Sequence, residues 1–186
     1  MAQPQPVWAT IDDLHRERGK AELIGGRIVR YMPTGFKPGR VGGRIFRKLD
    51  EHCDQSGRGA ATPDNVGFAV PVLRSGRESF SPDAAYYAGE LPENPMRFIS
   101  GPPTLAVEVR SENDYSPAAE AAMAAKRADY FEAGTLVVWD VDPLAEVIRV
   151  FRGPDPLPSA VYGRGEEAEA GPAVPGWRVP VDWIFS

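Results

Sequence analysis

The run from residue 104 to residue 142 constrains the fold more than any other part of the sequence. It contains a strand-like stretch, "TLAVEVRS", a helix-like stretch, "SPAAEAAMAAKRADYFEAG", and a second strand-like stretch, "TLVVWDVD". Ser116 suits the N-cap of the helix, Pro117 its first position and Gly134 its C-terminal cap. Two strands joined by one helix are expected to lie parallel in one sheet, with a right-handed crossover. The sequence therefore predicts an α/β or α+β protein built on a central sheet.

Shorter signals predict further elements before this unit. Thr10 suits the N-cap of a short helix that ends near Gly19, and Gly25-Gly26 separates two strand-like runs as in a β-hairpin. Residues 40–54 have the pattern of a helix that stops near "QSGRG". The stretches "VGFAVPVL" and "AAYYA" are typical of strands. We therefore expect helices and strands to flank the central unit.

The part of the chain that follows the central unit is expected to be less regular. "EVIRVFR" predicts a strand that returns antiparallel after the "DPLAE" turn. The segment 153–176 is rich in Gly, Pro and Glu and is expected to be mostly loop, with the acidic "GEEAEAG" exposed. The final "GWRVPVDWIF" is expected to dock apolar side chains on the core.

Composition narrows the class of protein. A chain of 186 residues that is 42% hydrophobic fits one globular domain over residues 1–186, with residues 1–8 as a loose N-terminus. The single cysteine, Cys53, cannot form an internal disulfide, and no apolar run approaches the roughly 18 residues that span a membrane. We therefore expect a cytoplasmic protein without a membrane partner.

Charge limits how the chain can bind nucleic acid. A net charge of -5 is unfavourable for tight, sequence-independent binding to phosphates, because that binding depends on Lys and Arg displacing counterions. Any contact with nucleic acid must be local. Arg40, Arg44, Arg47 and Lys48 share one side of the helix predicted over 40–54, which is either a face for a phosphate backbone or a solvated surface.

An acidic side chain stands in the middle of the first central strand. Glu108 shares a face of "LAVEVRS" with Ala106 and Arg110, and an ionised carboxylate there is costly unless a cation compensates it. One candidate is an ion pair with Arg110. The other is a divalent cation held together with Asp83 of "SPDAAYY", because Mg²⁺ takes one or two carboxylates plus waters and phosphate oxygens. The pattern predicts a metal site or an ion pair.

Lys126 is the third residue with potential chemistry. Its neighbours on the predicted helix are Ala119, Met123 and Tyr130, so its stem lies beside a partly apolar side, although a solvated surface lysine is the alternative. Other chemistries have no support, since the sequence lacks His or Cys at metal-ligand spacing, a phosphate-binding loop, a GxGxxG fingerprint and a GxSxG elbow.

The order "AELIGGRIV", "SPDAAYY", "LAVEVRS" and "KRADYFEAGTLVVWDVDP" resembles the Uma2 family of restriction-endonuclease-like proteins, a branch of the PD-(D/E)XK nuclease superfamily. The resemblance runs from Glu22 to the terminal "GWRVPVDWIF". It implies a restriction-endonuclease-like core, with a central mixed β-sheet flanked by α-helices, and Asp83 and Glu108 as metal ligands. The lysine of the superfamily usually follows the acid by two positions, where this chain has Arg110, and the resemblance maps it instead to Lys126. Glu22 matches a further acid of the same pocket.

The function implied by this resemblance is metal-dependent hydrolysis of DNA phosphodiester bonds. Mg²⁺, or Mn²⁺ in its place, would be held by Asp83, Glu108 and the main-chain carbonyl of Val109. Lys126 would orient or help deprotonate the attacking water, and Arg110 would contact phosphate. A homodimer would combine two weak basic faces.

Two alternatives stay open at this point. One is a non-catalytic nucleic-acid-binding or protein-interaction module that retains the fold, in which Glu108 pairs with Arg110 and Lys126 is solvated. The other is an enzyme that acts on RNA or nucleotides.

Overall fold

The computed structural model describes residues 8–186, so the predicted loose terminus lies outside the described residues except for Trp8. The helices are α1 (Ile11–Leu14), α2 (Phe36–Ser56), α3 (Pro117–Ala133) and α4 (Val181–Phe185). The strands are β1 (Ala21–Ile24), β2 (Arg27–Arg30), β3 (Ala60–Pro63), β4 (Phe68–Ala69), β5 (Ser79–Phe80), β6 (Ala84–Tyr87), β7 (Ile99–Ser100), β8 (Leu105–Val109), β9 (Val137–Asp142), β10 (Val147–Phe151), β11 (Ala160–Tyr162), β12 (Glu167–Glu169) and β13 (Arg178–Pro180).

A six-stranded mixed sheet forms the centre of the fold, with strand order β11-β10-β9-β8-β6-β3. β8 and β9 lie parallel and are connected by α3, while the other neighbouring strands are antiparallel. This confirms the predicted α+β class, the mixed sheet and the parallel pair around α3. The caps predicted for α3 are also present: the Ser116 side chain accepts a hydrogen bond from Ala119 N–H, and Gly134 adopts the left-handed conformation.

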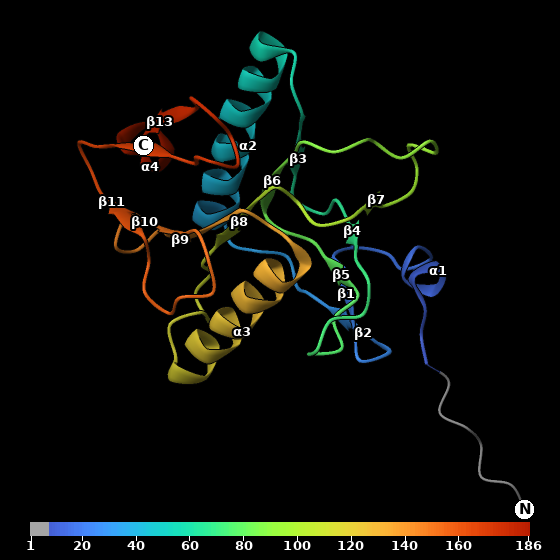
Figure 1. The fold of residues 1–186 in the computed structure, drawn as a ribbon. Helices are drawn as coiled ribbons and strands as arrows, with labels where there is room; N and C mark the ends of the chain where they lie inside the picture. Colours follow the sequence, from blue (N-terminus) through green and yellow to red (C-terminus); the bar gives the residue numbers. More distant parts are fainter. Residues whose placement is uncertain (1–7) are drawn as a thin grey trace, which may run out of the picture.

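The sheet lies between α2 and α3 (Figure 1). α2 places apolar side chains at helical spacing toward one face, where they join residues of β8 and β9 in one core. The C-terminal segment completes this core, because the Trp177 and Trp139 rings stack at 5.2 Å. The members from α2 are Val41, Ile45, Leu49 and Cys53.

The opposite face of the sheet carries α3 and a smaller, more polar layer. Ala106 and Val138 pack there against Tyr130 of α3, whose ring stacks on Phe80 at 4.1 Å. The hairpin β1–β2 and the three-stranded sheet β5-β4-β7 adjoin this layer, and Leu23 N–H donates to Ser79 Oγ at 2.8 Å. Because side chains alternate along a strand, Glu108 shares this face with Ala106. The central acid therefore points toward α3.

Several boundaries differ from the sequence-based expectation. α2 begins at Phe36 rather than residue 40, because Gly35 supplies an extended N-cap and Pro38 fits the first turn of a helix. The leading helix is only one turn long, although its predicted N-cap, Thr10, forms a full capping box with Asp13. β3, β5 and β7 were not expected, since strands of two to four residues leave almost no periodic signal.

The segment 153–176 is mostly loop and includes two short strands. The segment contains β11 at an edge of the central sheet and β12, which pairs with β13. The acidic run is not simply an exposed loop: Ala168 and Ala170 are buried in the core, and Glu169 forms an ion pair with Arg152. Alternation of small apolar residues with acids reflects a short strand with one buried face.

The basic side of α2 is tied to the C-terminal segment. Arg44 and Lys48 lie over the Trp183 ring at 5.2 and 4.8 Å, and Arg44 also donates to the Trp183 carbonyl. Arg47 and Lys48 pair with Glu51. Arg44 and Lys48 therefore bind Trp183 of α4, and Arg47 and Lys48 pair with the charge of Glu51. This side of α2 is not a wholly solvated surface. Among residues 8–186, no helix is long and apolar enough to cross a membrane.

Candidate active site

Asp83 and Glu108 lie near each other at one end of the β6–β8 pair, with the Glu108 side chain on the α3 face of the central sheet. β6 pairs with β8 in a register that matches Ala84 with Val107, so Asp83 and Glu108 each lie next to this last matched pair. The regular ladder ends at Ala84, because Asp83 N–H donates to the Val107 carbonyl at 3.0 Å rather than to the carbonyl of Glu108. Asp83 Oδ2 in turn accepts from Val109 N–H at 2.7 Å. The two acids that are 25 positions apart in sequence thus meet at one end of the β6–β8 pair.

Glu108 has partners from α3 rather than from its own strand. Its Oε1 accepts a hydrogen bond from the Tyr130 hydroxyl at 2.6 Å and lies 2.8 Å from Lys126 Nζ. The alternative in which Glu108 pairs with Arg110 is wrong. The Arg110 side chain turns instead to Asp140 of the neighbouring strand β9 and to Glu120 of α3.

Lys126 links Glu108 to Glu22. Its Nζ lies 2.8 Å from Glu108 Oε1 and 3.0 Å from Glu22 Oε1, and only 16% of its side chain is exposed. The alternative of a solvated lysine is therefore wrong. Burial lowers the pKa of Lys126, but the charges of Glu108 and Glu22 outweigh burial and the net shift is upward. The side chain is an ammonium at neutral pH.

Glu22 is fully buried and receives donors from four directions. Beside Lys126, it pairs with Arg77 and accepts from Ser81 N–H at 2.9 Å and from the Tyr31 hydroxyl at 2.8 Å. Burial raises the pKa of Glu22, but Lys126 and Arg77, together with the two hydrogen bonds, lower it to about 2. Glu22 therefore acts as an ionised anchor for the cations of the site.

This pKa gives a prediction for acid stability. Because the folded pKa of Glu22 lies below its ordinary value of 4.5, its contribution is present above pH 4.5 and is lost as pH falls toward 2. The full shift corresponds to roughly 3 kcal/mol. Urea unfolding of Glu22→Gln should show a smaller loss of unfolding free energy between about pH 5 and pH 3 than wild type, whereas the exposed control Glu112→Gln should follow wild type. If the unfolding free energy of all three proteins falls equally with pH over this range, the prediction is contradicted.

Glu108 has the opposite electrostatic balance. Burial raises its pKa, Lys126 opposes that effect, and the negative charge of Asp83 adds to the rise, so that the net shift is upward. A further cation placed between the two acids would therefore relieve an unfavourable interaction.

Arg110 does not fit the predicted role of phosphate ligand. Its side chain is 5% exposed and makes four hydrogen bonds, two to Asp140 and two to Glu120. These use four of the five N–H donors of a guanidinium. The residue is a buried structural cation, and its place two positions after Glu108 puts it at the crossing of β8, β9 and α3.

Sequence reasoning missed two charged residues of this site. Lys20 Nζ lies 2.6 Å from Asp83 Oδ1 and 2.7 Å from Asp64 Oδ1. Two signals pointed to them: Lys20 precedes Glu22 by two positions and so shares its face of the strand, and Asp64 follows a proline just as Asp83 does.

Two cavities in the described part of the chain lie near Asp83. One, of about 170 Å³, is lined by Thr34, Pro38, Gly39, Gly42, Gly43, Pro63, Asp64, Asp83 and Val109. Gly42 of α2 lies beside Asp83, since a Cβ at this position would be in van der Waals contact with the Asp83 carbonyl oxygen, at 3.5 Å. This cavity gives access to Asp83 from the side of α2.

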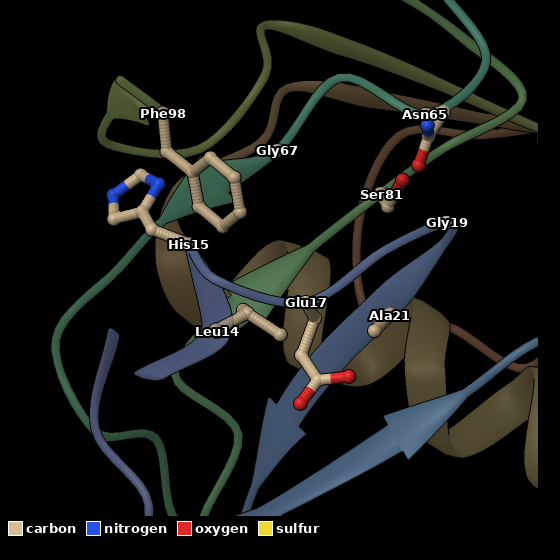
Figure 2. Close-up of a pocket in the computed structure, with 9 residues that line it drawn as sticks. All are labelled: Leu14, His15, Glu17, Gly19, Ala21, Asn65, Gly67, Ser81 and Phe98. Atoms are coloured by element: carbon tan, nitrogen blue, oxygen red, sulfur yellow. The ribbon is translucent and has the colours of Figure 1, made fainter. Parts of the chain in front are cut away.

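The second cavity, of about 150 Å³, lies beside β1 (Figure 2). Ser81 and Asn65 stand at one end of it and the neighbouring rings of His15 and Phe98 at the other (Figure 2). It is lined by residues adjacent in sequence to the site, such as Gly19, Asn65 and Ser81, and not by the acids themselves. The acids and their lysines are therefore not part of this cavity.

Comparison with known proteins identifies the family and the fold. The model of the Uma2 family, described as "Putative restriction endonuclease", matches residues 8–182. The fold is similar to a crystal structure at 1.96 Å resolution of a "putative nuclease belonging to DUF820" from Anabaena variabilis ATCC 29413. That match has a TM-score of 0.66 and 17% sequence identity, and covers 95% of this chain and 97% of the other. No curated protein matched this chain.

Proposed function

We propose a function from the premise that this chain belongs to the Uma2 family of restriction-endonuclease-like proteins. We infer that it is a metal-dependent nuclease that hydrolyses phosphodiester bonds of DNA. The observation that carries this inference is that Asp83 is hydrogen-bonded to Val109, the residue after Glu108, so that the two acids lie close together, with the ammonium of Lys126 2.8 Å from Glu108.

The donor set fits a hard divalent cation. Both Glu108 contacts, from Tyr130 and Lys126, are to Oε1, and Oε2 has no hydrogen-bond or ion-pair partner among residues 8–186. An under-coordinated carboxylate oxygen beside a second carboxylate suits Mg²⁺ or Mn²⁺, which prefer oxygen ligands. Within the same residues, no group of three or more His, Cys, Asp or Glu side chains could hold a metal ion. The site therefore suits a cation that takes few protein ligands and fills its other coordination positions with water and phosphate oxygens.

Asp83, Glu108 and the main-chain carbonyl of Val109 are the proposed ligands. A bound Mg²⁺ ion would polarise a phosphate oxygen and lower the pKa of a bound water. The protein contributes the alignment, because the backbone hydrogen bond from Val109 N–H to Asp83 Oδ2 keeps the Asp83 carboxylate against the end of β8.

Lys126 has a narrower role than a general acid–base residue. An ammonium with a raised pKa cannot accept a proton from water, so we propose that Lys126 orients the attacking water and offsets negative charge on the phosphate. Glu22 and Tyr130 hold this arrangement, the first by binding the ammonium and the second by donating to Glu108. Arg110 is left out of the substrate contacts because its donors are engaged.

The experiment that tests this function is cleavage of defined nucleic acids by purified protein. With Mg²⁺ or Mn²⁺ present, we expect supercoiled plasmid DNA to be nicked and linearised, and excess EDTA should stop the reaction. Parallel reactions with single-stranded DNA and RNA of matched length identify the preferred substrate. Absence of cleavage of every substrate under both metals would favour the non-catalytic module that retains the fold.

A further inference from the structure

Lys20 forms a second cationic contact in the candidate active site. It precedes β1, and its Nζ lies 2.6 Å from Asp83 Oδ1, which precedes β6, and 2.7 Å from Asp64 Oδ1, which follows β3. Lys20 and Asp83 are largely buried, with 18% and 22% of their side chains exposed, whereas Asp64 is 50% exposed. One ammonium therefore joins a buried carboxylate to one that faces solvent.

The Lys20 contact occupies the oxygen of Asp83 that the backbone leaves open. Oδ2 already accepts from Val109 N–H, and Oδ1 is held by Lys20. A divalent cation that uses the open oxygen of Asp83 must therefore displace the ammonium or share the oxygen with it, and two cations around one carboxylate oxygen repel each other. Lys20 and a metal ion compete for Asp83.

The charges around Glu108 explain why such an ammonium is useful. Asp83 and Glu108 lie close enough for their charges to interact, and without a metal ion their mutual repulsion needs compensation. Lys126 supplies it at Glu108 and Lys20 supplies it at Asp83. Burial lowers the pKa of Lys20, but Asp83 and Glu108 outweigh burial and keep the side chain charged.

We propose that Lys20 is a resident counter-ion of the metal site: its ammonium holds Asp83 in the metal-free protein, and a divalent cation displaces it onto Asp64. This proposal rests on the proposed function, since it requires that Asp83 be a metal ligand. Asp64 lines the 170 Å³ cavity together with Asp83, so the displaced ammonium stays at the entrance where a phosphate would arrive. Lys20 then becomes a positioning residue that adds positive charge on the substrate side.

Calorimetric titration of Mg²⁺ and Mn²⁺ tests the proposal without relying on cleavage. Lys20→Met keeps the apolar stem and removes the competing charge, so metal affinity should rise by about tenfold, within the usual range of coupling between two sites. Thermal unfolding without metal should occur at a lower temperature in this variant, because Asp83 and Glu108 are then less compensated. Asp64→Asn should have the opposite effect on affinity, a decrease of several-fold, because the displaced ammonium has lost its second partner.

The controls separate this proposal from the proposed function. Lys37→Met removes an exposed lysine that pairs with Glu146 and should leave metal affinity unchanged. Lys20→Gln repeats the test if the Met variant does not fold. If wild type binds metal, Glu108→Gln does not, and the Lys20 variants bind as wild type does, the proposed function stands and the counter-ion role is overturned. If neither wild type nor the Lys20 variants bind metal, both are overturned.

Discussion

Replacing Glu108 by Gln should lower the rate of metal-dependent DNA cleavage by at least about 100-fold, the range seen when one preorganised charge or ligand is removed from an active site. The amide keeps the size of the carboxylate and can still accept from Tyr130 and Lys126, so the fold should survive. It loses the negative charge that pairs with a cation. Asp83→Asn and Lys126→Met should cause losses of the same order, measured as initial rates of plasmid nicking with Mg²⁺.

The exposed acid Glu112 provides a matched control for this series. Glu112→Gln changes the net charge of the protein by the same amount as Glu108→Gln and should cleave at the wild-type rate. Circular dichroism of each variant separates lost activity from lost structure. Wild-type rates in a folded Glu108→Gln protein would remove the carboxylate pair from the mechanism and favour an interaction module.

The parts of the fold that could be predicted are those with long periodic signals and clear caps. The helix α3 has Ser, Pro and Gly at its ends, and the apolar runs of β8 and β9 fix it between parallel strands. The two-residue strands β5 and β7 could not be predicted, because their pairing with β4 depends on tertiary position. The burial of Ala168 in β12 and of Ala170 just after it was missed for a related reason, since Glu and Gly around them dominate the local composition.

Site residues could be predicted where the alternation of a strand or the periodicity of a helix fixes the direction of the side chain. Glu108 lies on a strand whose alternation fixes its face, and Lys126 lies one turn before Tyr130 on the adjoining helix. The ion-pair partners were not predictable in the same way. The contact between Lys20 and Asp83 spans 63 positions, and that between Arg110 and Asp140 spans 30, so both depend on strand order rather than on local pattern. The alternative that paired Glu108 with Arg110 fails for this reason.

Replacing Arg110 by Met should destabilise the protein by about 3–5 kcal/mol, the usual cost of removing one partner of a buried ion pair. The guanidinium binds both oxygens of Asp140, which is almost fully buried in β9. Without it, the one ion-pair partner left to Asp140 within residues 8–186 is the neighbouring Arg127, at 3.6 Å, and the Glu120 side chain loses both of its hydrogen bonds to Arg110. Urea unfolding at neutral pH measures the loss.

A double variant shows whether the uncompensated charge is the cause. Asp140→Asn removes that charge, so Arg110→Met/Asp140→Asn should lose less stability than the sum of the two single variants, by at least about 1 kcal/mol of coupling. Arg16→Met is the matched control, because Arg16 pairs with Asp13 at the surface with 76% of its side chain exposed and should change stability by less than about 0.5 kcal/mol. The same variants show whether Arg110 stabilises the fold or binds the substrate phosphate. Since its donors are engaged within the fold, the cleavage rate per folded Arg110→Met molecule should match wild type, whereas a phosphate ligand would raise KM while the protein remains folded.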